Sequence, residues 1–193
     1  MNTLFDIGTT AHRRPVTAHQ LINQDSGDVE YYTPAWVTEA ASMVMGGIDL
    51  DPASCEVANK TVGAARYFTV ADNGLMMPWY GRVWMNHPFG KAHNRQWINR
   101  LVAEFIAGHI SQACCICFAS TSEAWFQPLF NYAQCYLSPR LNYISQGNVK
   151  KGVSKGSVVT YLGPHVDRFA AVFGQHGRVM VPHATNSAAG RVA

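Results

Sequence analysis

The sequence predicts an α/β fold in which helices cover both faces of a mostly parallel β-sheet. Apolar stretches with helical periodicity alternate with short β-rich stretches, which is typical of a parallel sheet with helical crossovers. Polar residues end two expected strands, at Asp51 and Asn86, and ligands of such sheets bind at the carboxyl ends of strands. The 193 residues, 48% hydrophobic and 14% charged, suit one globular domain.

The first elements are a helix, a strand and a second helix. Thr33 before Pro34 is a helix-start signal, with Thr33 as N-cap, and Gly46 and Gly47 end that helix. A short buried strand is expected at 48–51. A turn at Pro52 then leads into a helix that ends near residue 65.

The remaining elements continue the alternation. Strands are expected at 66–69, 82–86, 112–119, 134–137, 141–144, 157–162 and 178–181. Helices are expected at 93–107, 122–132 and 165–173. The domain should span 31–183, between a polar N-terminal arm at 1–30 that orders only partly and a flexible tail at 184–193.

The compartment follows from the start of the chain and from its cysteines. Residues 1–10 lack the basic start and apolar stretch of a signal peptide, so we expect a cytoplasmic protein. Five cysteines, three of them in one apolar run, indicate buried core thiols. A metal pair at Cys115 and Cys117 is the alternative, but no second pair stands at ligand spacing, so no metal site is expected.

Charge is distributed unevenly along the chain. Residues 1–81 hold four Lys/Arg and nine Asp/Glu, whereas residues 82–193 hold eleven and three, giving net charges of −5 and +8. This asymmetry favours a polyanion as partner of the second half, and a solvated basic face is the alternative. The DNA-binding candidates are Arg140, Lys150, Lys151 and Lys155, in a segment rich in Gly and Ser.

The acidic strand end at Asp49 and Asp51 favours a cationic cofactor. S-adenosylmethionine carries positive charge on its sulfonium and its amino group, so it suits a carboxylate-lined pocket better than a phosphate-bearing cofactor does. The chain lacks both the dinucleotide fingerprint and a phosphate-cradling loop, which argues against NAD. Asp51 interrupts a buried apolar strand, and a buried carboxylate needs a partner.

Asn86, His87, Pro88 and Phe89 are the catalytic candidates. An exocyclic amine is a poor nucleophile because its lone pair is delocalised into the ring. Asn86 can accept a hydrogen bond from such an amine, and Phe89 can stack on the base.

Several motifs follow one another in order: Tyr32-Thr33-Pro34-X-Trp36, Asp49-Leu50-Asp51-Pro52-Ala53-Ser54, Asp72-X-Gly74-Leu75 and Val83-Trp84-X-Asn86-X-Pro88-Phe89-Gly90. In order and spacing they resemble the phage Dam-like DNA N6-adenine methyltransferases, over about residues 31–163. The resemblance implies a single Rossmann-like methyltransferase domain that uses S-adenosylmethionine to methylate adenine N6 in double-stranded DNA. It also implies a phage or prophage origin and a role in protecting DNA against restriction.

The resemblance also implies roles for residues. The cofactor-binding candidates are Tyr32, Thr33, Pro34, Asp49, Asp51, Pro52, Ala53 and Asp72. Asp72 would reach the cofactor adenine, and a turn-forming carboxylate is its alternative reading. Asn86 and the carbonyl of His87 would accept hydrogen bonds from the target amine of a flipped base that stacks on Phe89. Transfer from sulfur to nitrogen would be direct, without a covalent enzyme intermediate.

His87 departs from the family, which has Pro at this position. The substitution is compatible with unchanged function, with an altered target base or rate, or with lost activity. Cytosine-N4 methylation, and a catalytically inactive relic that binds DNA or cofactor, therefore remain alternatives to adenine-N6 methylation.

Overall fold

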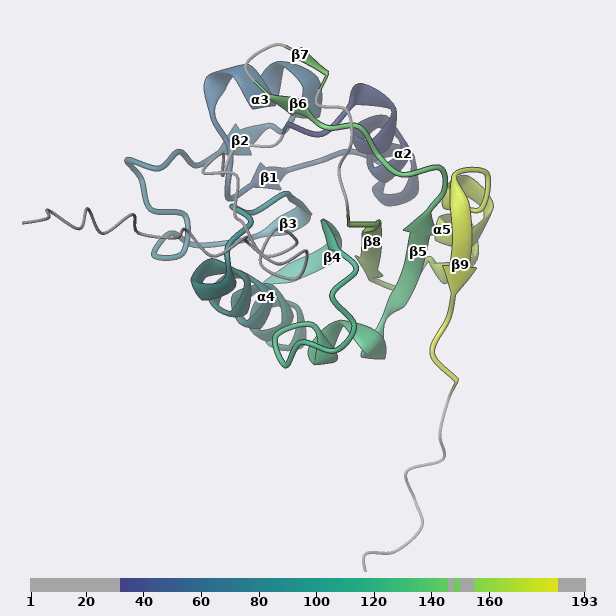
Figure 1. Ribbon diagram of the computed structural model, residues 1–193. Helices are drawn as coiled ribbons and strands as arrows, with labels where there is room; N and C mark the ends of the chain where they lie inside the picture. Colours follow the sequence, from purple (N-terminus) through teal and green to yellow (C-terminus); the bar gives the residue numbers. More distant parts are fainter. Residues whose placement is uncertain (1–31, 146–147, 150–154, 184–193) are drawn as a thin grey trace, which may run out of the picture.

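The computed structural model describes residues 32–145, 148–149 and 155–183, which are built around a seven-stranded β-sheet (Figure 1). The expected arm at 1–30 and tail at 184–193 lie outside the described residues. The limits of the expected domain therefore stay a prediction.

The sheet is parallel in its first half and antiparallel in its second. Its strands, in spatial order, are β2 (Arg66–Tyr67), β1 (Leu50–Asp51), β3 (Gly81–Met85), β4 (Ile110–Phe118), β8 (Ser157–Leu162), β5 (Ala133–Leu137) and β9 (Gly177–Met180). Pairings from β2 to β4 are parallel, and those from β4 to β9 are antiparallel. The prediction of a mostly parallel sheet is wrong for the second half, because β8 lies between β4 and β5 and runs opposite to both. Local alternation does not encode that insertion.

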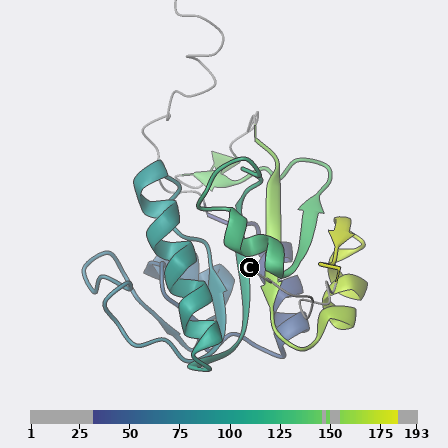
Figure 2. The ribbon, with the colours of Figure 1, turned by 90° about the horizontal axis from the view of Figure 1, so that it is seen from below.

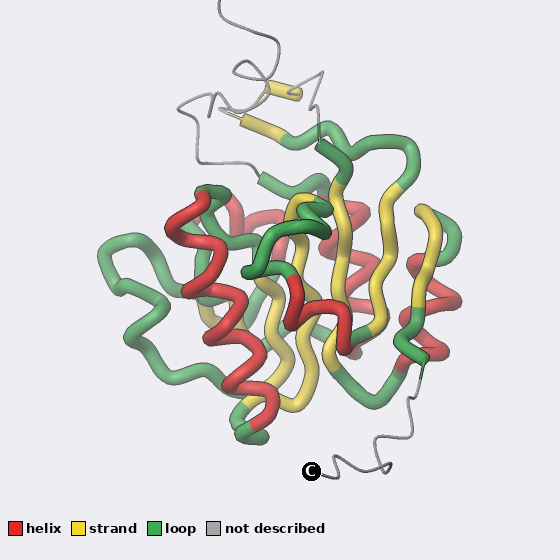
Figure 3. Tube along the Cα trace, turned by 60° about the horizontal axis from the view of Figure 1, so that its bottom comes forward, coloured by secondary structure: helices red, strands yellow, loops and turns green. Residues whose placement is uncertain are grey.

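Helices cover both faces of the sheet, as predicted. They are α2 (Ala35–Met45), α3 (Glu56–Val62), α4 (Lys91–Ile106), α5 (Val166–Phe173) and the 3₁₀ helix η1 (Gln127–Asn131). Figures 2 and 3 show α4 and η1 over one face, with α2 and α5 over the other. Among the described residues, no helix is both long and apolar enough to cross a bilayer.

Three local predictions are wrong. The helix expected at 122–132 is reduced to η1, whose second residue is Pro128, a residue without a backbone N–H to donate. The strand expected at 141–144 is instead the two-residue β6 (Ile144–Ser145), which pairs with β7 (Asn148–Val149). The first helix has Pro34 as N-cap, so Thr33 lies outside it.

The core lies on both sides of β4. Cys114, Cys115 and Cys117 are buried in this strand, and Cys135 is buried in β5. These four thiols are core residues, as predicted. Cys55 is only half-buried and precedes α3 as its N-cap, where its sulfur accepts a hydrogen bond from the amide of Ala58.

Gly74 joins two loops at the carboxyl edge of the sheet. Its carbonyl accepts a 2.8 Å hydrogen bond from the indole of Trp79, and a Cβ on Gly74 would overlap the carbonyl oxygen of Pro52, which follows β1. The loop 69–77 therefore packs on the β1 turn only because residue 74 lacks a side chain.

We expect Gly74→Ala to lower the free energy of unfolding by about 1 to 3 kcal/mol, the usual cost of overpacking. Chemical denaturation measures it. Gly156→Ala is the matched control, because a Cβ at Gly156 would meet no atom within 4 Å. Equal stability of both variants would show that the loop adjusts freely.

Candidate active site

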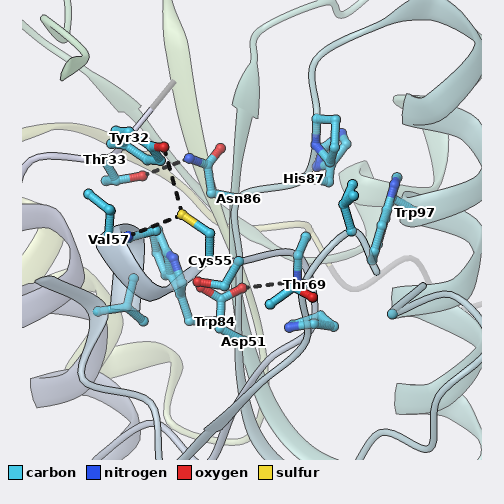
Figure 4. Close-up of a pocket in the computed structure, with 18 of the residues that line it drawn as sticks. Tyr32, Thr33, Asp51, Cys55, Val57, Thr69, Trp84, Asn86, His87 and Trp97 are labelled. Atoms are coloured by element: carbon cyan, nitrogen blue, oxygen red, sulfur yellow. Dashed lines mark hydrogen bonds between the residues drawn. The ribbon is translucent and has the colours of Figure 1, made fainter. Parts of the chain in front are cut away.

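A cavity of about 540 Å³ lies at the carboxyl ends of β1 and β3 (Figure 4). Asp51 is the last residue of β1, and Asn86 directly follows β3. The candidate residues that line this cavity are Tyr32, Thr33, Asp51, Pro52, Ala53, Asn86, His87, Pro88 and Phe89. Two motifs more than 30 residues apart in the sequence thus contribute to one cavity.

Asp51 places a buried carboxyl group on the cavity wall. Its side chain is 2% exposed, and Oδ1 accepts a 3.1 Å hydrogen bond from the backbone amide of Ala53. Burial raises the pKa of Asp51 to about 7, because desolvation outweighs that hydrogen bond. A cation bound beside Asp51 would favour the charged form.

Thr33 orients the amide of Asn86. The Nδ2 atom of Asn86 donates a 3.0 Å hydrogen bond to Oγ1 of Thr33, and Figure 4 shows the two side chains meeting. The carbonyl oxygen of the amide therefore points away from Thr33. Thr33 therefore supports the expected catalytic amide and is not the helix cap that the sequence predicts.

His87 is fully buried beside Asn86. Its Nε2 lies 2.9 Å from Oδ1 of Asn94 on α4, while Nδ1 is buried without a hydrogen-bond partner among the described residues. Burial lowers the pKa of His87 to about 4, so its ring is neutral at pH 7.

Phe89 lies in an aromatic cluster. Its ring centroid is 4.5 Å from that of Phe118, 5.7 Å from that of Tyr143 and 5.7 Å from that of His87. Phe89 is 6% exposed, yet it lines the cavity. The cluster fixes the orientation of the ring, and its role as the platform for a base stays a prediction.

The residues present fit S-adenosylmethionine. The cavity volume falls within the range of about 300 to 1,000 Å³ typical of small-molecule sites. Asp51 supplies a carboxyl group for a positive charge. Trp84 also lines the cavity, and its indole Nε1 is buried without a hydrogen-bond partner in the described part of the chain.

Three cofactor candidates do not line the cavity. Asp49 forms an ion pair with Arg82, with Oδ1 2.6 Å from Nη2, and its hydrogen bonds with Arg82 lower its pKa. Asp72 accepts hydrogen bonds from the amide and hydroxyl of Thr69, which is the turn-forming role given as the alternative to a cofactor contact. Pro34 caps α2. The structure therefore gives Asp49 and Asp72 partners within the protein, and their roles in cofactor binding stay predictions.

The basic candidates lie at the same edge of the sheet as the cavity, as far as the structure describes them. Arg140 follows the carboxyl end of β5, and Lys155 precedes β8, whose first residue pairs with Phe118 at the end of β4. The Nζ of Lys155 lies 5.8 Å from the ring centroid of Phe118. Lys150 and Lys151 lie outside the described residues.

Sequence reasoning missed several cavity residues. They include Cys55, Val57, Thr61, Trp97 and Ile144. Trp97 lies in the helix expected at 93–107, and Cys55 is one of the five cysteines expected in the core. Both residues also line the cavity. Cys55 follows the Pro-Ala-Ser turn directly, which was the available signal. Ile144 gave none, because its backbone pairing with Tyr32 is a long-range contact.

Comparison with known families decides the family. A profile described as DNA N-6-adenine-methyltransferase (Dam) matches residues 21–172. The chain belongs to this family. A search of curated protein sequences finds no match. The family accounts for the resemblance of the motifs, and its members act on adenine in DNA, which makes DNA the substrate that membership implies.

Asp51 should make stability depend on pH. Its pKa is about 7 in the folded protein, above the ordinary value of 3.8, so the folded state binds the extra proton between these pH values. The contribution of Asp51 to stability therefore falls as pH rises from 4 to 7.

We expect Asp51→Asn, which keeps the acceptor for Ala53, to gain stability relative to the wild type by roughly 2 to 4 kcal/mol as pH rises over that interval. Denaturant titrations at several pH values measure this difference. A difference that is constant with pH would show that Asp51 ionises normally.

Proposed function

We propose that the protein is an S-adenosylmethionine-dependent DNA methyltransferase that transfers a methyl group to N6 of a flipped-out adenine. One observation carries this proposal. In a chain of the DNA N-6-adenine-methyltransferase family, a single cavity is lined by both the Asp51 turn and the segment from Asn86 to Phe89. A phage or prophage origin, a role in protection against restriction and a cytoplasmic location are part of the proposal, supported by the resemblance to phage enzymes.

S-adenosylmethionine supplies an electrophilic methyl group when it is bound. Asp51 and the turn through Ala53 would hold the cationic part of this cofactor, because the buried carboxyl gains a counter-charge that offsets its desolvation. Trp84 would donate a hydrogen bond to a cofactor acceptor. Tyr32 and Thr33 would close the cavity from the side of β6, to which Tyr32 is bonded.

The tetrad would bind the target base. Asn86 presents its carbonyl oxygen to an amine hydrogen, since Thr33 already accepts from its amide nitrogen. The backbone carbonyl of His87 accepts the second hydrogen, and Phe89 stacks on the base. Each contact restrains the amine so that its lone pair faces the methyl group, and positioning of this kind contributes most of the rate.

Flipping exposes an amine that is otherwise paired inside the duplex, and it costs on the order of a few kcal/mol. Stacking of the base on aromatic rings offsets part of that cost. The aromatic cluster around Phe89 and the cations at Arg140 and Lys155 lie at one edge of the sheet. The cluster would hold the flipped base while the cations contact the phosphate backbone of the DNA.

The central test is methyl transfer to DNA, followed by mass spectrometry of the nucleosides. N6-methyladenine should appear with the wild type, and Asn86→Ala should reduce transfer by a factor of roughly 100 or more while calorimetric binding of S-adenosylmethionine is unchanged. Asn131→Ala, at an exposed position on η1, is the control. N4-methylcytosine would move the assignment to cytosine, and cofactor binding without transfer would indicate an inactive relic.

DNA binding should depend on salt through the basic residues. Replacing Lys150, Lys151 and Lys155 by Ala should weaken binding to every sequence, and the slope of log K against log salt should decrease by about 0.9 per lost phosphate contact. Lys60→Ala is the matched control, because this exposed residue pairs with Glu56 on α3. An unchanged slope in the triple variant would assign the three lysines to a solvated surface.

A further inference from the structure

His87 carries a buried polar atom that nothing in the described protein satisfies. The side chain is 1% exposed and lines the cavity, and its Nδ1 has no hydrogen-bond partner among the described residues. A buried polar atom left unpaired costs about 1 to 3 kcal/mol. His87 itself lines the ligand cavity, so a ligand that reaches Nδ1 would complete the missing contact.

Asn94 determines what kind of partner Nδ1 needs. The Oδ1 atom of Asn94, 2.9 Å from Nε2, is a carbonyl oxygen and can only accept, so Nε2 carries the proton. A neutral imidazole has one proton, and Nδ1 is therefore left with a lone pair. Burial also lowers the pKa of His87 to about 4, which keeps the second proton off this nitrogen at pH 7.

The position of the ring indicates which ligand supplies the donor. His87 directly follows Asn86, and its ring meets that of Phe89 edge-on, at 5.7 Å and 87°. The buried carboxyl of Asp51 lies on a different strand, β1, and the half-buried Cys55 follows the turn after it. The ring thus belongs to the part of the cavity where the tetrad would hold a base.

We propose that Nδ1 of His87 accepts a hydrogen bond from the exocyclic amino group of the target base, and that Asn94 is the positioning residue that keeps this nitrogen unprotonated. This inference rests on the proposed function. The amino group has two hydrogens, so Nδ1 of His87 accepts the second one in place of the His87 backbone carbonyl, while Asn86 accepts the first. The substitution of Pro by His then gives this chain a specific contact with the base.

The test compares His87→Asn with His87→Leu. These side chains have nearly the same shape, and both remove the contact with Asn94, but only Asn places a polar acceptor near the position of Nδ1. We expect single-turnover methyl transfer at saturating S-adenosylmethionine to be at least about tenfold faster in His87→Asn than in His87→Leu, the effect of one hydrogen bond. Thermal unfolding and the Kd of the cofactor should be similar in both.

Equal transfer rates in the two variants would overturn the proposal, and so would a difference confined to the Kd of S-adenosylmethionine, because the cofactor would then be the donor. Asn94→Leu provides an independent measurement if His87→Leu does not fold. It leaves His87 in place but removes the acceptor that holds the ring proton on Nε2. Transfer should therefore slow severalfold at unchanged cofactor affinity. An unchanged rate would overturn the role of Asn94. Failure of the wild type to methylate DNA would instead reject the proposed function.

Discussion

The parallel pairing of β1 with β3 is the constraint on which the candidate site depends. The two strands run in the same direction, with Leu50 opposite Val83, so both end at the same edge of the sheet. Asp51 and Asn86 therefore line one cavity although 35 positions separate them in the printed sequence. An antiparallel pairing would place the two residues at opposite edges. The parallel pairing of β1 with β3 sets the position of the cavity. The Gly74 loop and the bridge between Tyr32 and Ile144 enclose it.

The cavity combines buried polar groups with an aromatic wall. Burial shifts the pKa of Asp51 upward and that of His87 downward, so both groups are biased toward their neutral forms. A neutral, largely apolar wall suits a flat base, whereas a cation beside Asp51 restores its charge and releases a proton near pH 7.

The antiparallel half of the sheet serves a different purpose. Because β8 runs between β4 and β5, its first residue lies at the edge where β4 and β5 end. Lys155 and Arg140 consequently lie on the same side of the sheet as the cavity, and Lys155 reaches the ring of Phe118, which itself contacts Phe89. This order of strands connects the basic segment to the aromatic cluster, which a wholly parallel sheet with helical crossovers would not do.

The sequence by itself determined the elements with strong local signals and the family. The boundaries of β8 follow from β-rich residues, Gly46 ends α2 through its positive φ, and Asp51 and Asn86 stand directly at strand ends. Only the tertiary structure decided where Asp49 and Asp72 find their partners, that Thr33 supports Asn86, and that His87 meets Asn94. Periodicity and capping act over a few residues and are visible in the chain. Strand direction and the pairing of buried polar groups depend on residues that meet only after folding.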